Sequence, residues 1–180
     1  LIPPGSGRRL RLMPRDPRHD ILFEPVRIGP KTLRNRFYQT PHCTGFGVAK
    51  PQTQAAFRGM KAEGGWAAVN TEYCSISPES DDSPYVSARL WDDEDARLLS
   101  LTVEEAHRHG ALAGVQLWHG GVLAENRESR LPTLAPSPLQ SSLDPLIVAR
   151  PMTLADIRRV QAQWVTAALR GRAAGFDIVY

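Results

Sequence analysis

Residues 37–47 read FYQTPHCTGFG, an apolar segment that runs into a proline and then into a glycine-rich loop. Residues 33–38 alternate apolar and polar side chains, which predicts a β-strand, and Gly45 and Gly47 suit the loop that follows. We therefore expect Cys43 just past a strand end, where barrels of alternating parallel strands and helices carry out their chemistry. A cysteine there is reactive only if its pKa is lowered; the alternative is a small buried hydrophobic side chain.

Three more apolar runs of strand length follow, each preceded by a segment with helical character. The expected strands are 66–73, 111–118 and 176–180. The first expected helix is 52–63, the second starts at Asp92 or Asp93 and ends at Gly110, and the third starts at Thr153 and ends at Gly175. This alternation is typical of a parallel α/β fold. A complete eight-stranded barrel typically needs about 250 residues. The sequence therefore predicts a TIM (β/α)8 barrel of which only about the first four strands are present.

Two long segments, 75–89 and 120–151, separate these elements and are expected to be loops. Loops of this length are uncommon unless they are functional or disordered. In the last expected helix Trp164 lies on an apolar stripe at helical spacing, which favours a place in the core.

The composition is that of a soluble globular domain, with 180 residues, 42% of them hydrophobic and 23% charged. No apolar run approaches the roughly 20 residues that a membrane-spanning helix needs, and the start of the chain has no apolar segment typical of a secretion signal. The two cysteines, Cys43 and Cys74, are too few for a disulfide framework or a zinc site. We expect a cytoplasmic protein without a membrane partner.

The formal charge of +3 comes from the start of the chain, where residues 1–20 hold five arginines against two aspartates. The rest of the chain is neutral, which argues against a nucleic-acid partner. We expect residues 1–14 to form a disordered basic tail, and residues 1–12 to lie upstream of the natural start at Met13.

Several longer motifs resemble one family of enzymes. They are DILFEPVRIGPKTLRNR at 20–36, PHC at 41–43, KAEGGWAA at 61–68, NTEYCS at 70–75, PESDD at 78–82 and AGFDIVY at 174–180. Together they resemble the opening of the Old Yellow Enzyme superfamily of flavin-dependent barrels, and more finely its trimethylamine and dimethylamine dehydrogenase branch. The resemblance covers nearly everything from Arg15 onward, so it implies that residues 15–180 are the amino-terminal half of an FMN-binding TIM barrel.

The resemblance implies a set of cofactor-binding residues at the strand ends, namely Pro41, His42, Cys43 and Gln116. In the amine dehydrogenases the cysteine that matches Cys43 is bonded covalently to FMN, whereas in other branches a cysteine near this place only contacts the flavin. Gln116 matches a position that hydrogen-bonds the pyrimidine edge of the flavin, and an amide can donate and accept at once. His42 could donate to the flavin edge or could be a satisfied structural group.

Two further residues are implied to bind substrate. Tyr73 matches a member of an aromatic bowl that holds an alkylammonium head, which is a cation–π site; without the resemblance, packing would be the ordinary role of an aromatic residue there. His119 follows the broad superfamily pattern but departs from trimethylamine dehydrogenase, which has a tyrosine at this position. His119 could serve the site or pack beneath it.

The implied function is FMN-dependent oxidative N-demethylation of a small methylated amine. No catalytic residue is certain within the chain, because the tyrosine and histidine of the amine dehydrogenases follow just after the position of Tyr180. The 4Fe-4S cluster and ADP are expected only in the remainder of the whole protein, which is expected to be a homo-oligomer with an unknown electron acceptor. Alternatives are an NAD(P)H-dependent ene-reductase or dienoyl reductase of the same superfamily, which His119 fits better, and a non-catalytic fragment.

Overall fold

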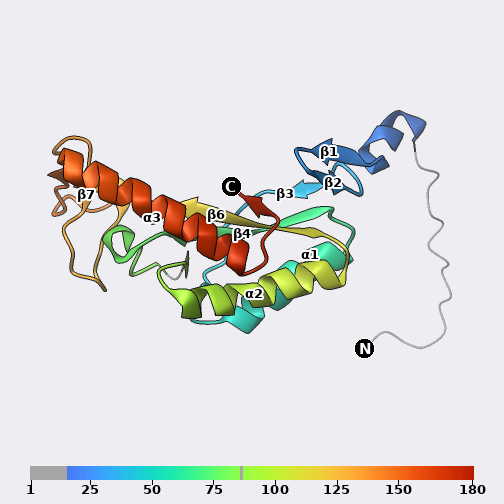
Figure 1. Ribbon diagram of the computed structural model, residues 1–180, viewed down its shortest axis with the longest axis horizontal. Coiled ribbons are helices and arrows are strands. Elements are labelled where there is room, and N and C mark those ends of the chain that lie inside the picture. Colours follow the sequence, from blue (N-terminus) through green and yellow to red (C-terminus); the bar gives the residue numbers. More distant parts are fainter. Residues whose placement is uncertain (1–15, 86) are drawn as a thin grey trace, which may run out of the picture.

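The computed structural model describes residues 16–85 and 87–180 and contains one main parallel sheet with helices packed against it (Figure 1). The expectations for a basic tail over 1–14 and for a start at Met13 lie outside the described residues. The sheet contains four strands in the order β3-β4-β6-β9, all parallel, and a short strand β5 pairs with the end of β4. Their bounds are Tyr38–Gln39 for β3, Ala68–Ser75 for β4, Ala88–Arg89 for β5, Leu112–Trp118 for β6 and Ile178–Val179 for β9.

Each parallel pair is joined by one helix, as the sequence predicted. The helices are α1 (Pro51–Glu63), α2 (Asp93–Arg108) and α3 (Leu154–Ala173). Figure 1 shows α1 and α2 side by side on one face of the sheet and α3 running beside β6. Strand–helix–strand units of this kind place every strand's carboxyl end at the same edge of the sheet.

The helix boundaries follow from capping residues that are visible in the sequence. Asp92 begins α2 because its Oδ1 accepts a hydrogen bond from the backbone N–H of Asp95 at 2.9 Å. Thr153 and Asp156 form a reciprocal capping box at the start of α3. Gly110 and Gly175 follow the helix ends with φ of +69° and +96°, a conformation that L side chains rarely adopt.

The main hydrophobic core lies between the sheet and the helices. Its largest cluster joins β4, β6, α2 and α3 through residues that include Cys74, Leu90, Val103, Val115 and Phe176. Burying these side chains contributes most of the favourable free energy of folding, at about 25 cal/mol per Å² of apolar surface.

The first strand differs from its prediction. Residues 33–38 were expected to form it, but Leu33 ends an antiparallel hairpin, and the parallel sheet starts only at Tyr38. The hairpin strands are β1 (Val26–Ile28) and β2 (Lys31–Leu33). Leu33 packs with Ala67 and Ala68 beneath the start of the sheet. This position is therefore apolar because the hairpin buries it, and not because it belongs to the parallel sheet.

The long loops contain short elements of their own. Three 3-10 helices occur in the described residues, at Pro17–Phe23, Pro78–Ser80 and Gly121–Leu123. Strands β7 (Leu134–Ala135) and β8 (Arg150–Pro151) pair with each other in the segment before α3. Among the described residues, the expectation of irregular structure is therefore wrong at Pro78–Ser80 and β5 in the segment 75–89, and at Gly121–Leu123, β7 and β8 in the segment 120–151.

Asp177 ties the amino-terminal hairpin to the sheet. Its carboxylate accepts hydrogen bonds from Lys31 Nζ at 2.7 Å, from His107 Nε2 at 2.7 Å and from the Ala113 N–H at 3.0 Å. Burial tends to raise the pKa of this carboxyl, but the three hydrogen bonds outweigh burial and the pKa lies below its ordinary value of 3.8. The ionised form is therefore the stabilising one.

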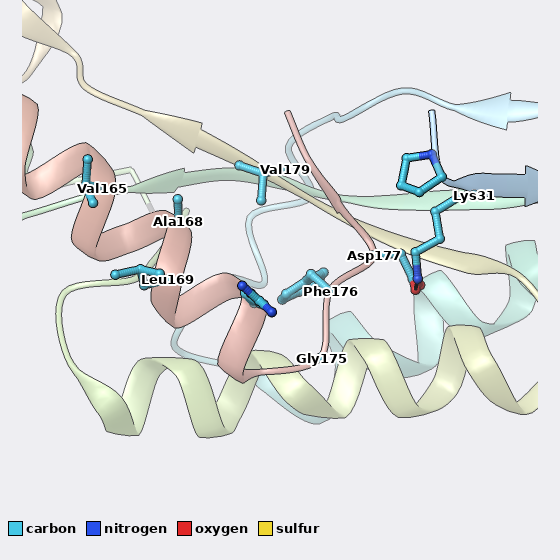
Figure 2. A pocket seen from close by; sticks show the side chains of 10 residues that line it. Lys31, Val165, Ala168, Leu169, Gly175, Phe176, Asp177 and Val179 are labelled. Atoms are coloured by element: carbon cyan, nitrogen blue, oxygen red, sulfur yellow. Dashed lines mark hydrogen bonds and ion pairs between the residues drawn. The ribbon is translucent and has the colours of Figure 1, made fainter. Parts of the chain in front are cut away.

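One side of the sheet and of α3 is uncovered in the described residues. Strand β9 pairs with β6 on one side only, and a hollow of about 760 Å³ lies between the hairpin, β9 and α3. Val165 and Leu169 of α3 and Phe176 and Val179 near the end of the chain are among the residues that line it (Figure 2). Trp164 lies 38% exposed on α3, so the prediction that it belongs to the core is wrong, because no further strand or helix covers this part of α3 in the described structure.

Candidate functional site at the carboxyl ends of the strands

Three strand ends bring the candidate residues to one edge of the sheet. β3 is followed by Cys43, β4 ends beside Tyr73, and β6 carries Gln116 near its end and His119 just after it. Tyr73 and Gln116 are direct register partners across the parallel pair. The parallel register, more than the sequence spacing, is what makes these side chains neighbours.

Cys43 is exposed, while Cys74 is fully buried on the helix side of the sheet. Partial burial and the charge of Glu72 raise the pKa of the Cys43 thiol, and hydrogen bonding from the main chain and side chain of Tyr73 opposes that rise. The structure therefore presents the thiol next to Tyr73 but holds it protonated at neutral pH. Activation of this sulfur needs a further group that stabilises the thiolate.

The loop after Cys43 is held by a buried carboxylate. Glu72 has no exposed surface. One of its oxygens accepts from the Thr44 N–H at 2.7 Å and lies 3.0 Å from the Thr44 hydroxyl, and the other accepts from the Gly47 N–H at 2.9 Å. Gly47 has a φ of +33° and its Cα packs against the backbone of Ser87, so no side chain fits there. These contacts fix the path of the chain on one side of the thiol.

The residue before Cys43 is held by a buried guanidinium. Arg58 on α1 has no exposed surface, and its Nη2 donates to the His42 carbonyl oxygen at 2.6 Å. His42 Nδ1 lies 3.0 Å from Arg58 Nη1 and 3.1 Å from Gln39 Nε2, both of which are donors. Nδ1 therefore accepts, and the ring proton is assigned to Nε2. Burial and the nearby Arg58 charge lower the pKa of His42, so its ring is neutral at pH 7.

Tyr73 lies beside the thiol, and its ring packs against the ring of Trp118. Their ring centroids lie 4.9 Å apart with an interplanar angle of 36°. The Tyr73 hydroxyl donates to Asp82 Oδ2, which also accepts from the Ser87 hydroxyl at 2.8 Å. Burial, together with the bond to Asp82, raises the pKa of Tyr73, so the phenol stays neutral. Neutral aromatic faces next to a buried carboxylate suit a small organic cation.

Gln116 and His119 carry polar groups without partners in the described residues. The Gln116 side chain is half-buried and makes no hydrogen bond among the described residues. His119 Nδ1 accepts from the Gly121 N–H at 3.1 Å, whereas its buried Nε2 has no partner in the described part of the chain. Burial lowers the pKa of His119, so the ring is neutral and Nε2 carries the proton. A half-buried amide and an unpaired N–H indicate a polar ligand.

These donors and acceptors fit the ring system of a flavin. An isoalloxazine presents carbonyl oxygens and ring nitrogens along one edge, which the Gln116 amide can pair with. The described residues contain no group of three His, Cys, Asp or Glu side chains that could hold a metal ion. No helix in the described ranges has the length and apolar character needed to cross a bilayer.

Comparisons with known proteins agree with a flavin site. Residues 21–180 match the NADH:flavin oxidoreductase / NADH oxidase family, and the chain belongs to this family. It is 49% identical over 173 residues to dimethylamine dehydrogenase of Hyphomicrobium and 32% identical over 162 residues to an NADPH dehydrogenase of Halalkalibacterium halodurans. The matched segments cover 93% and 88% of this chain, but only 24% and 46% of the two relatives.

Solved structures confirm the predicted fold class. The histamine dehydrogenase from Rhizobium sp. 4-9 superposes with a TM-score of 0.87 at 43% identity, covering 92% of this chain and 26% of that protein. Old Yellow Enzyme from Pichia sp. AKU4542 superposes with a TM-score of 0.80 at 25% identity, covering 88% and 45%. The four parallel strands and their helices are thus part of a TIM barrel of the Old Yellow Enzyme type, as the motifs implied.

Four residues of this site were not found from the sequence: Arg58, Glu72, Asp82 and Trp118. Glu72 had a weak signal, since a carboxylate at the polar end of an apolar strand is unusual, and Asp82 lies in the PESDD motif at 78–82. Arg58 has no signal of its own, because a basic residue on a helix is ordinarily solvent-exposed.

Proposed function

We propose that this chain is the flavin-binding part of an FMN-dependent amine dehydrogenase that acts on a small methylated amine. The observation that carries the proposal is the aromatic pair of Tyr73 and Trp118, of which Tyr73 neighbours Cys43, in a chain that is 49% identical to dimethylamine dehydrogenase. The family match supports FMN as the cofactor. Pro41, His42, Cys43 and Gln116 would hold the flavin.

The residues of the chain bind and orient the substrate. Tyr73 and Trp118 would contact an alkylammonium through their ring faces, and the ionised form of Asp82 would add a negative charge behind Tyr73. FMN held by this chain would supply the hydride-accepting chemistry for oxidation of an N-methyl carbon, and the overall products would be the demethylated amine and formaldehyde. The protein supplies position, water exclusion and electrostatics for this chemistry. His119 would donate from Nε2 to a polar atom of the bound ligands.

A covalent bond between FMN and Cys43 is part of the proposal. The exposed position of the sulfur next to Tyr73 supports it. In the purified whole protein, yellow colour should stay with the pellet after acid precipitation and should move to the supernatant in the Cys43→Ser variant. Colour that leaves the pellet in the unmodified protein would show that Cys43 only contacts the flavin.

The second candidate function is an ene-reductase, in which a nicotinamide donor would reduce the flavin and an activated carbon–carbon double bond would then be reduced. The likeness to an NADPH dehydrogenase and the histidine at position 119 favour it. Steady-state assays of the whole protein with trimethylamine, dimethylamine, histamine and an enone would separate the two functions. Turnover of the enone alone would overturn the amine proposal, and a purified protein without flavin would favour a non-catalytic role.

The remaining features of the whole protein are proposed from the same likeness. The chain spans about a quarter of the length of dimethylamine dehydrogenase. We propose that the rest of the protein holds the 4Fe-4S cluster, the ADP and the contacts of a homo-oligomer. We also propose that the whole protein is located in the cytoplasm. The electron acceptor can be identified by assaying candidate acceptors with the reduced protein.

A further inference from the structure

We propose that Arg58 and Glu72 are positioning residues for Cys43: two buried side chains of opposite charge hold the main chain on either side of the thiol, and their charges shift its thiolate fraction in opposite directions. The inference rests on the proposed function in one respect, namely that Cys43 lies against the flavin. Neither residue was expected from the sequence to take part in the site. Both act on Cys43 through space and through its neighbours, without touching the reacting atoms.

The carboxylate holds residues 44 to 47. Glu72 uses both oxygens on main-chain N–H groups, those of Thr44 and Gly47, at 2.7 and 2.9 Å. An uncharged amide has only one acceptor oxygen and would leave one of these N–H groups facing an NH2 group. The buried carboxylate therefore fits this loop in a way that glutamine does not.

The guanidinium holds residue 42. Arg58 donates to the His42 carbonyl oxygen and to its ring nitrogen from two different Nη atoms, and Nη1 also lies 3.3 Å from Gln39 Oε1. Burial lowers the pKa of Arg58 to about 10, with the nearby Glu72 charge opposing that effect, so the side chain stays cationic at neutral pH. Cys43 thus lies between a backbone segment held by a cation and one held by an anion.

Charged and titratable groups face Cys43 from every element around it. Glu72 and Tyr73 belong to β4, Arg58 to α1 and Asp82 to the loop after β4, while His42 is the adjacent residue. Glu72 and Asp82 disfavour the thiolate, and Tyr73 favours it by hydrogen bonding. The electrostatic attraction between the positive Arg58 and the Cys43 thiolate favours it. Removing the charge of Glu72 should therefore lower the pKa of the Cys43 thiol, and removing the charge of Arg58 should raise it.

The experiment measures the alkylation rate of Cys43 by iodoacetamide against pH in the whole protein prepared without FMN. Peptide mass mapping separates Cys43 from Cys74, which is fully buried and serves as an internal control. Glu72→Gln should lower the pH midpoint and Arg58→Gln should raise it. At a pH below the midpoints each change should alter the rate by up to about tenfold, as expected when one charge that acts on the thiol is lost.

Charge-keeping variants separate positioning from charge. Glu72→Asp and Arg58→Lys should leave the midpoint near that of the unmodified protein but speed hydrogen exchange of the amides in residues 42–47, because the shorter or unforked groups cannot span the same contacts. These variants also decide the positioning half of the proposal if the charge-removing variants do not fold. Unchanged amide exchange in both would overturn it.

Midpoints that do not move, or that move in the same direction in Glu72→Gln and Arg58→Gln, would overturn the proposed control of the thiol. None of these readouts requires bound flavin. If the midpoints move as expected while the unmodified protein binds no FMN, the proposed function fails and the roles of Arg58 and Glu72 on Cys43 stand.

Discussion

Replacing Tyr73 by leucine should weaken binding of a cationic amine while leaving the fold in place. Tyr73 is half-buried and contributes one of two ring walls, since Trp118 lies 4.9 Å away and is unchanged by the substitution. A desolvated cation–π contact contributes about 2 kcal/mol and an exposed one about 0.5–1 kcal/mol. For a half-buried ring we take about 1–2 kcal/mol, which corresponds to a roughly five- to thirtyfold increase in Kd.

The assay is calorimetric titration of the flavin-loaded whole protein with tetramethylammonium, a cation whose nitrogen has no lone pair and therefore cannot form an iminium. Tyr73→Phe is the matched control, because it keeps the ring face and removes only the hydroxyl that donates to Asp82. Its affinity for the cation should stay within about threefold of that of the unmodified protein, since phenylalanine also binds cations. Its stability should fall by about 1–3 kcal/mol, because Asp82 loses a hydrogen-bond donor.

A Tyr73→Leu variant that binds tetramethylammonium as tightly as the unmodified protein would refute the cation–π reasoning. An equal loss of affinity in the leucine and phenylalanine variants would assign the effect to the hydroxyl and Asp82 instead of the ring.

Three further predictions concern the scaffold and are measured by urea unfolding of the whole protein. Asp177→Asn should lower the free energy of unfolding at pH 7 by about 1–3 kcal/mol, and equal stability of variant and parent at pH 7 would contradict this. Because the folded pKa of Asp177 is below its ordinary value, the contribution is present above pH 4 and disappears as the pH falls through the folded pKa. Gly114→Ala should be poorly tolerated, because its Cβ would overlap the Asn70 side chain, and a variant with unchanged stability would show that Asn70 can move. Thr153→Ala should lower stability by about 1 kcal/mol through loss of the capping box, and no loss would mean that α3 is held by its packing alone.

Much of the fold could be predicted because its signals are local. The caps at Asp92 and Thr153 and the glycines after α2 and α3 act within a few residues of the chain, so the helix boundaries are readable from the sequence. The error at residues 33–38 has the opposite cause. Leu33 is apolar because a hairpin buries it, and alternation alone does not tell which partner strand does so.

The candidate site could be predicted only in part. Tyr73, Gln116 and Cys43 were found from strand ends and from the motif resemblance, and the structure brings Cys43 next to Tyr73 and Tyr73 opposite Gln116. Their roles toward FMN and substrate stay predictions. Arg58 was missed because the direction in which a helix residue points depends on what packs beside that helix.

The sequence by itself determined the alternation of parallel strands and helices, the helix caps and the position of Cys43 just past a strand end, because each depends on periodicity, proline and glycine over short distances. Only the tertiary structure decided which polar groups turn inward onto Cys43. The contacts of Glu72 with the loop at 44–47, of Arg58 with His42, and of Tyr73 with Trp118 and Asp82 join residues far apart in the chain. They exist because parallel strands in one register place their carboxyl ends at a common edge, where buried polar groups must find partners.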